Sequence, residues 1–106
     1  MELEIERIFL TNEFYPDKKI NDFNTYTDVI VQLKSGKKFI ASFFTYQNIE
    51  SIWKENVKSK EFMSGKYFWK KQMVLIEDCS KDTIEKVVYH LIKEGDFKSV
   101  FTNMTN

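Results

Sequence analysis

The chain has 106 residues, of which 42% are hydrophobic and 30% are charged, and its formal net charge is zero. These values indicate one globular domain with a hydrophobic core, and they exclude collagen-like, low-complexity and disordered chains. One cysteine and one histidine are too few for an internal disulfide or a structural zinc site. The acidic N-terminus lacks the basic and apolar regions of a signal peptide, and no apolar run is long enough to span a membrane, so we expect a cytoplasmic protein.

The charges are segregated along the chain although they cancel overall. Residues 1–28 hold seven acids and three bases, a net charge of −4, whereas residues 29–76 hold three acids and nine bases, a net charge of +6. Residues 77–106 hold six acids and four bases, a net charge of −2. All bases except Arg7 are lysines. Because arginine is the residue that reads guanine and phosphate through paired hydrogen bonds, this composition argues against specific nucleic-acid binding.

The first predicted element is a strand over residues 3–11. Leu3 and Ile5 alternate with polar residues, and the alternation then shifts to Ile8 and Leu10, which indicates a bulge near Arg7. A helix is the alternative for this segment. Residues 12–26 show no period and predict a long surface loop, pinned to the core by the aromatic side chains Phe14, Tyr15, Phe23 and Tyr26.

A β-hairpin is predicted over residues 28–34 and 37–44, with a turn at Ser35-Gly36. A two-residue turn sets Val31 opposite Ile40. In that register Val29, Val31, Leu33, Ile40 and Phe44 share one face, and Ile30, Phe39, Ala41 and Phe43 share the other. Apolar residues on both faces predict that the second strand is central and covered on both sides.

An amphipathic helix is predicted from residue 46 to residue 59, with Thr45 as its N-cap. Its apolar stripe has the spacing of one helical face and comprises Ile49, Ile52, Trp53 and Val57. Gly65 marks the exit from this region, and a strand is predicted over residues 73–77.

A second amphipathic helix is predicted between Ser80, as its N-cap, and Gly95, with the apolar stripe Ile84, Val87, Val88, Leu91 and Ile92. Asp96 starts one further turn, and residues 102–106 predict a frayed tail. The order β-ββ-α-β-α therefore predicts one α+β domain over residues 1–101, in which a small, mainly antiparallel sheet packs against two amphipathic helices.

The residues that could perform catalysis are dispersed. His90 falls on the polar face of the second helix, without an acid to orient it. Cys79 precedes the same helix, where a lowered thiol pKa is conceivable, but a small buried hydrophobe is the favoured interpretation. The segment from Asp17 to Asp28 lacks the glycine and glutamate of an EF-hand loop. No catalytic, cofactor or metal site is predicted.

The segment from Gly65 to Lys71 is the most unusual stretch of the sequence. Three consecutive aromatic residues, 67–69, are flanked by three lysines, which suits an acidic partner or a nucleobase. The alternative is a short strand with Tyr67 and Trp69 on one face and Phe68 on the other, closing the core. Together with two aromatic residues of the long loop, the predicted interaction surface comprises Lys66, Tyr67, Trp69, Lys70, Lys71, Phe14 and Tyr15.

Two resemblances follow from these segments. The succession of Phe43-Phe44-Thr45, Asn48-Ile49 and residues 65–69, followed by a strand and an amphipathic helix, resembles a group of small uncharacterised bacterial single-domain proteins. In size and composition the chain is also similar to toxin-neutralising immunity proteins. Neither resemblance carries functional residues over to this chain.

We therefore expect a non-enzymatic, cytoplasmic protein-binding module with a protein partner, and an immunity protein is the most specific form of this expectation. The first alternative is an enzyme or redox-responsive protein that uses Cys79. A homodimer that pairs the edge at residues 3–10 is another. The last is a weak, nonspecific nucleic-acid binder that uses Lys34, Lys37, Lys38, Lys66, Lys70 and Lys71.

Overall fold

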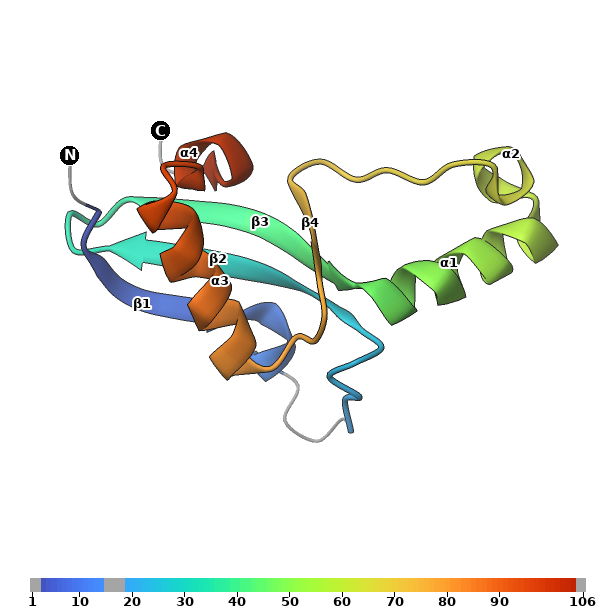
Figure 1. Ribbon diagram of the computed structural model, residues 1–106, viewed down its shortest axis with the longest axis horizontal. Helices are drawn as coiled ribbons and strands as arrows, with labels where there is room; N and C mark the ends of the chain where they lie inside the picture. Colours follow the sequence, from blue (N-terminus) through green and yellow to red (C-terminus); the bar gives the residue numbers. More distant parts are fainter. Residues whose placement is uncertain (1–2, 15–18, 105–106) are drawn as a thin grey trace.

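The computed structural model describes residues 3–14 and 19–104. These residues form an elongated molecule with extents of 46 × 30 × 25 Å, and its radius of gyration is 14.9 Å. A compact domain of this length has a radius of gyration of about 13 Å. The difference comes from an arm that projects from one end of the sheet (Figure 1).

The sheet has the strand order β1-β2-β3-β4, and a fifth strand also pairs with β3. Its strands are β1 (Ile5–Leu10), β2 (Tyr26–Leu33), β3 (Lys38–Thr45), β4 (Met73–Ile76) and β5 (Thr102–Asn103). All neighbouring pairs are antiparallel except β3 and β4, which are parallel. The predicted α+β class with a mainly antiparallel sheet is confirmed.

The predicted bulge in β1 is confirmed. Ile5 pairs with Leu33 and Arg7 pairs with Gln32, so Glu6 is the extra residue on the β1 side. The strand absorbs it because the apolar alternation shifts there, and Ile8 and Leu10 both reach the core. The alternative prediction of a helix for this segment is wrong.

The hairpin between β2 and β3 is confirmed, but the predicted register is wrong by one residue. Val31 pairs with Phe39, not with Ile40. The loop has three residues, 34–36, because Leu33 N donates to Lys37 O at 2.8 Å and Gly36 takes a left-handed φ of 94°. This is the geometry of a type I turn followed by a bulge. The slip places Phe39, Ala41 and Phe43 on the same face as Val29 and Val31.

That shared face carries the core, and two helices cover it (Figure 1). Helix α3 (Lys81–Lys93) begins at the predicted N-cap Ser80, whose Oγ accepts a hydrogen bond from Thr83 N, and it buries Ile84 and Val88. Helix α4 (Phe97–Val100) follows, and the rings of Phe97 and Phe101 pack on Phe39 and Phe43 of β3. As predicted, β3 is the central strand, and it is buried on both faces from Ala41 onward.

Two irregular segments differ from the predictions. The predicted loop 12–26 starts with a 3-10 helix, η1 (Thr11–Phe14), whose backbone Asn12 N donates to Thr27 Oγ1 at 3.2 Å. At the other end of the chain, residues 102 and 103 are not a frayed tail, because they form β5 beside Phe39 and Ile40. None of the described helices combines the length and apolar character needed to cross a membrane.

Candidate interaction surface

The projecting arm is built from helix α1 (Tyr46–Ser59), helix α2 (Glu61–Gly65) and the extended return segment 66–72 (Figure 1). Helix α1 starts as predicted at Thr45, whose Oγ1 accepts a hydrogen bond from Asn48 N at 3.1 Å. It then runs past the end of β3 and lies against α2 and the return segment. Only Asn56 of α1 is buried. The apolar stripe predicted for this helix is therefore left partly open, with 52% of Trp53 exposed.

The tip of the arm is a single left-handed turn. The φ angles of Phe62, Met63 and Ser64 are 51°, 55° and 58°, close to the left-handed helical value. For residues other than glycine this conformation costs roughly 1–2 kcal/mol per residue. Two hydrogen bonds close the turn, Ser64 N to Lys60 O at 3.3 Å and Lys66 N to Phe62 O at 3.1 Å.

A row of aromatic rings ties the return segment to the sheet. Tyr26 stacks on Phe44 of β3 with ring centroids 5.1 Å apart, and Phe44 meets Phe68 edge to face at 5.8 Å. Phe68 in turn meets Phe62 at 5.1 Å, and Phe62 meets Tyr67 at 5.4 Å. Each contact contributes about 0.5–1.5 kcal/mol beyond the area that it buries. The row fixes the direction in which the arm leaves the body.

An apolar groove of about 370 Å³ lies between the arm and β4. It opens on the face of the sheet opposite α3, because Leu75 pairs with Phe44, whereas Phe43 and its partner Val74 belong to the face that α3 covers. Large apolar side chains around the groove remain open to solvent: Leu75 is 42% exposed, Tyr67 is 51% exposed and Met63 of the neighbouring tip is 67% exposed. The groove is lined by Ile49, Trp53, Gly65, Tyr67, Phe68, Met73 and Leu75.

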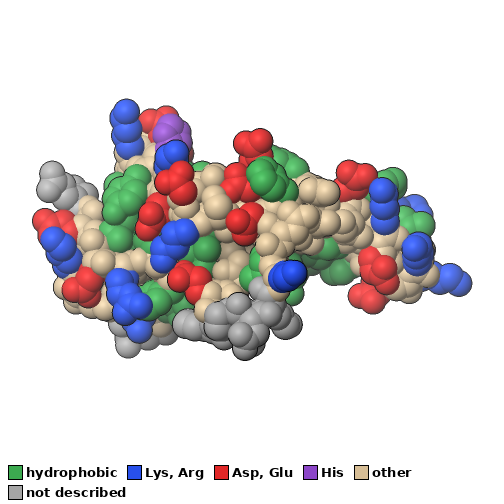
Figure 2. All heavy atoms as spheres, turned by 90° about the horizontal axis from the view of Figure 1, so that it is seen from below, with side chains coloured by type: hydrophobic (Ala, Val, Ile, Leu, Met, Phe, Trp, Pro, Cys, Tyr) green, Lys and Arg blue, Asp and Glu red, His purple; other side chains and the backbone are tan. Residues whose placement is uncertain are grey.

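The arm is basic. Residues 46–72 hold three acids and six lysines, which gives a net charge of +3. Glu50 pairs with Lys54 at 3.1 Å, and within the described ranges no other arm lysine forms an ion pair. Lysine side chains project from the arm end of the molecule in Figure 2. The unpaired members are Lys58, Lys60, Lys66, Lys70 and Lys71.

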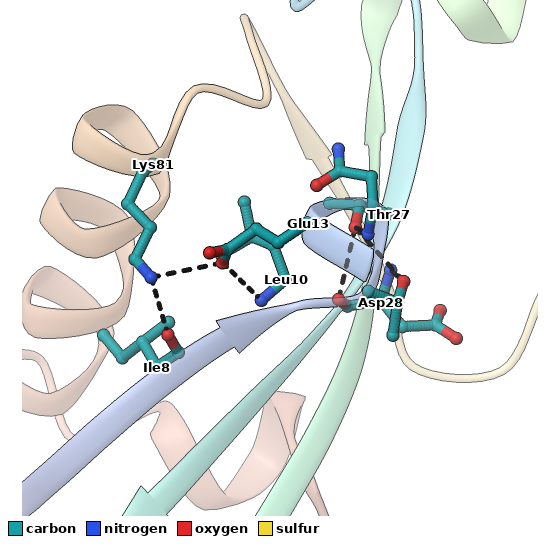
Figure 3. A network of polar contacts seen from close by, with 8 residues as sticks. Ile8, Leu10, Glu13, Thr27, Asp28 and Lys81 are labelled. Atoms are coloured by element: carbon teal, nitrogen blue, oxygen red, sulfur yellow. Dashed lines mark hydrogen bonds and ion pairs between the residues drawn. The ribbon is translucent and has the colours of Figure 1, made fainter. Parts of the chain in front are cut away.

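The two edges of the sheet differ in how they are protected. On the outer side of β1, Lys81 Nζ donates to Ile8 O at 2.9 Å, and Glu13 Oε1 accepts from Leu10 N at 3.0 Å (Figure 3). Lys81 and Glu13 also pair with each other at 3.1 Å. These side chains occupy backbone groups that a second copy would need for pairing through residues 3–10. The edge at β4 has no such protection among the described residues.

A second groove, of about 430 Å³, lies between β1 and α3. Most of its charged groups already have partners: Lys81 pairs with Glu13, Glu6 accepts a hydrogen bond from Gln32, and the Arg7 guanidinium lies 4.1 Å from the centre of the Phe9 ring. Charged side chains that already pair with each other at the surface indicate a solvated groove more than a binding site.

The structure brings together five of the seven predicted surface residues. Lys66, Tyr67, Trp69, Lys70 and Lys71 all lie on the return segment, and 64% of Trp69 is exposed, so these aromatic residues do not close the core as a strand. The backbone of Phe14 ends η1 beside β1, at the opposite edge of the sheet from β4. Tyr15 lies outside the described residues.

Several groove residues were absent from the predicted surface, although their pattern was visible. Ile49 and Trp53 belong to the apolar stripe recognised in α1, which the sequence assigned to the core. Met73 and Leu75 belong to the predicted strand. Helical spacing shows which side of a helix is apolar, but it does not show whether another element covers that side.

The two residues considered for catalysis do not form a site. The Cys79 side chain is 2% exposed and lies 3.8 Å from Phe43 O, and burial, with the nearby charges of Asp78 and Asp22, raises the pKa of its thiol to about 12. His90 is exposed on α3. The interpretation of Cys79 as a small buried residue is confirmed.

The junction before α3 has an ordinary structural role. Asp78 accepts hydrogen bonds from the backbone N and the Oγ of Ser80 and from Thr83 Oγ1, and the Ser80 side chain is the main reason that the pKa of this carboxyl lies below its usual value. Within the described ranges, no three His, Cys, Asp or Glu side chains lie together in a way that would hold a metal ion.

The predicted lysine patch for nucleic acid falls into two groups. Lys34, Lys37 and Lys38 lie at the β2–β3 turn, whereas the other three lie on the return segment at the far end of β3 (Figure 1). Comparison with protein family models, with curated proteins and with solved structures gives no match for this chain.

Proposed function

We propose that the protein is a non-enzymatic protein-binding module and that the arm is its docking element. The observation that carries this proposal is the exposure of large apolar side chains on one projecting arm: Trp53, Met63, Tyr67, Trp69 and, at its base, Leu75. Isolated exposed apolar residues are ordinary on protein surfaces, but a contiguous group around a groove is typical of an interaction site.

The composition of the arm supports a protein partner. Tryptophan and tyrosine are enriched where protein interfaces concentrate their binding energy, because each buries a large area with few rotatable bonds. The lysines of the arm favour an acidic partner and faster association with it. A cytoplasmic immunity protein, which neutralises a toxin by binding to it, is the most specific form of this proposal.

The alternatives have less support. A nucleophile at Cys79 would need an accessible thiolate, and this thiol is buried with a raised pKa. A nonspecific nucleic-acid groove would need a continuous basic path, and the six lysines stand in two separate groups.

Site-specific photo-crosslinking in the source cell tests the proposal. A benzophenone amino acid replaces Tyr67 on the arm or Tyr89 on α3, which is the matched control because 55% of Tyr89 is exposed and it lies on another element. We expect one discrete protein adduct from position 67 and none of the same mass from position 89. No protein adduct from position 67, or the same adduct from both positions, would contradict the proposal.

A further inference from the structure

We infer that the groove, as part of the proposed docking arm, receives an extended acidic segment of the partner protein, which pairs with the free edge of β4 as an additional strand. This inference rests on the proposed function and adds the mode of binding and the chemistry of the ligand. Strand addition of this kind obtains affinity from backbone hydrogen bonds and specificity from pockets for alternate side chains.

The hydrogen bonding of β4 leaves one edge open. Ser42 N donates to Gln72 O at 2.8 Å, so the backbone groups of residues 72, 74 and 76 point toward β3. The N–H and C=O groups of Met73 and Leu75 therefore point away from the sheet, because successive residues of a strand alternate in direction. No hydrogen-bond partner for these outward groups is found in the described part of the chain.

Apart from its short length of four residues, this edge lacks the devices that usually prevent strand pairing. The sequence of β4 is Met-Val-Leu-Ile, with no charge, proline or bulge. Exposed edges are normally blocked by such features, as Lys81 and Glu13 do at β1. The contrast between the two edges of one sheet indicates that the β4 edge is kept available.

The groove lies where the side chains of an added strand would fall. Met73 and Leu75 line it together with Trp53 of α1 and Tyr67 of the return segment. Alternate side chains of a strand paired with β4 would point toward the same face as Leu75. The incoming segment would therefore place every second side chain in the apolar groove.

The charge of the arm disfavours the docking of two arms against each other and favours an acidic ligand. A second molecule docked arm against arm would bring two surfaces of net charge +3 together. Like charges across an interface are unfavourable, whereas an acidic segment would meet the unpaired lysines, including Lys66 and Lys71. The expected ligand alternates apolar residues with aspartate or glutamate.

A phage-displayed library of random 12-residue peptides, selected on the immobilised full chain, supplies the probe. Peptides that also bind Trp53→Ala are removed by counter-selection. We expect enriched peptides that alternate apolar and acidic residues. Failure to enrich any peptide over the counter-selection, or enrichment of peptides without acidic residues, would overturn the inference.

The binding mode is tested with one synthetic enriched peptide. Leu75→Pro removes an outward N–H together with a side chain that lines the groove, and should weaken binding roughly tenfold. Leu75→Ala, which removes most of the same side chain but keeps the N–H, is the control and should weaken binding clearly less. If Leu75→Pro does not fold, amide hydrogen exchange of the wild-type chain gives the same information, because the peptide should slow exchange at Met73 and Leu75. Unchanged binding by Leu75→Pro, or unchanged exchange, would overturn strand addition.

The two proposals fail separately. Loss of binding in Trp53→Ala together with full binding by Leu75→Pro would retain the arm as docking surface and reject strand addition. A crosslinked partner from position 67 without any enriched peptide would likewise retain the arm as docking surface and reject strand addition. Absence of the crosslink would reject the docking arm itself.

Discussion

Gly65 lies so close to α1 that a Cβ atom added to it would come within 3.1 Å of Trp53 Cδ1 and within 2.8 Å of Val57 Cγ2. Its φ of 79° is also unfavourable for any other residue. This contact fixes the spacing between α1 and the tip of the arm. The groove therefore depends on a glycine at this position.

Gly65→Ala should destabilise the arm more than Gly95→Ala. Gly95 has nearly the same φ, 80°, but an added Cβ there meets nothing within 4 Å. The control should lose roughly 1–2 kcal/mol through backbone strain, and Gly65→Ala should lose roughly 1–3 kcal/mol more through overpacking. Urea unfolding gives both values, and equal losses would contradict the packing described for Gly65.

Thr45→Ala should reduce the free energy of unfolding by roughly 2–3 kcal/mol. Thr45 is fully buried, and its Oγ1 accepts hydrogen bonds from Asn48 N at 3.1 Å and Thr25 N at 3.2 Å. Thr45→Ser keeps the acceptor and should lose much less. A similar loss in both variants, measured by thermal unfolding, would show that the methyl group matters and the cap does not.

Lys81→Met should expose the edge of β1 to pairing. The substitution removes the donor to Ile8 O and the partner of Glu13, at a cost in stability of about 1 kcal/mol or less because the pair is half exposed. Lys86→Met, which breaks an exposed pair with Asp82, is the control. Light scattering should reveal concentration-dependent association of the first variant only. A monomeric Lys81→Met would show that this lysine does not protect the edge.

The Cys79 thiol should resist modification in the folded protein. Its pKa of about 12 exceeds the value of 9.0 for an unperturbed thiol, so folding favours the protonated form. The resulting stabilisation is fully present below about pH 9 and is lost as the pH rises from there toward 12. Cys79→Ala should remove this alkaline part of the pH dependence. Rapid labelling of the native thiol by a maleimide at pH 8 would contradict the burial described here.

Local features of the fold were predictable because their signals are local. Thr45 and Ser80 cap their helices through hydrogen bonds three residues along the chain, and Glu6 bulges where the apolar alternation shifts. The hairpin register was not predictable from Ser35-Gly36 alone, because a two-residue and a three-residue loop both place glycine at a position of positive φ. One residue of difference moved Phe39, Ala41 and Phe43 to the opposite face.

The candidate surface was predictable only in part. The lysines and aromatic residues of segment 66–71 predicted an interaction surface by their composition. Trp53 and Leu75 were not predicted to belong to it, because apolar residues with regular spacing predict a buried face. Only the tertiary arrangement leaves these two side chains exposed to solvent. None of the residues from Phe62 to Ser64 is a glycine, so the sequence did not predict a left-handed turn at these positions.

The central claim is that the arm is the docking element, and the affinity of arm variants for the crosslinked partner tests it most directly. Isothermal titration calorimetry with the purified partner should give at least about tenfold weaker binding for Trp53→Ala and a change below about twofold for Tyr89→Ala. Equal affinities for wild type and Trp53→Ala, with both proteins folded, would contradict the claim.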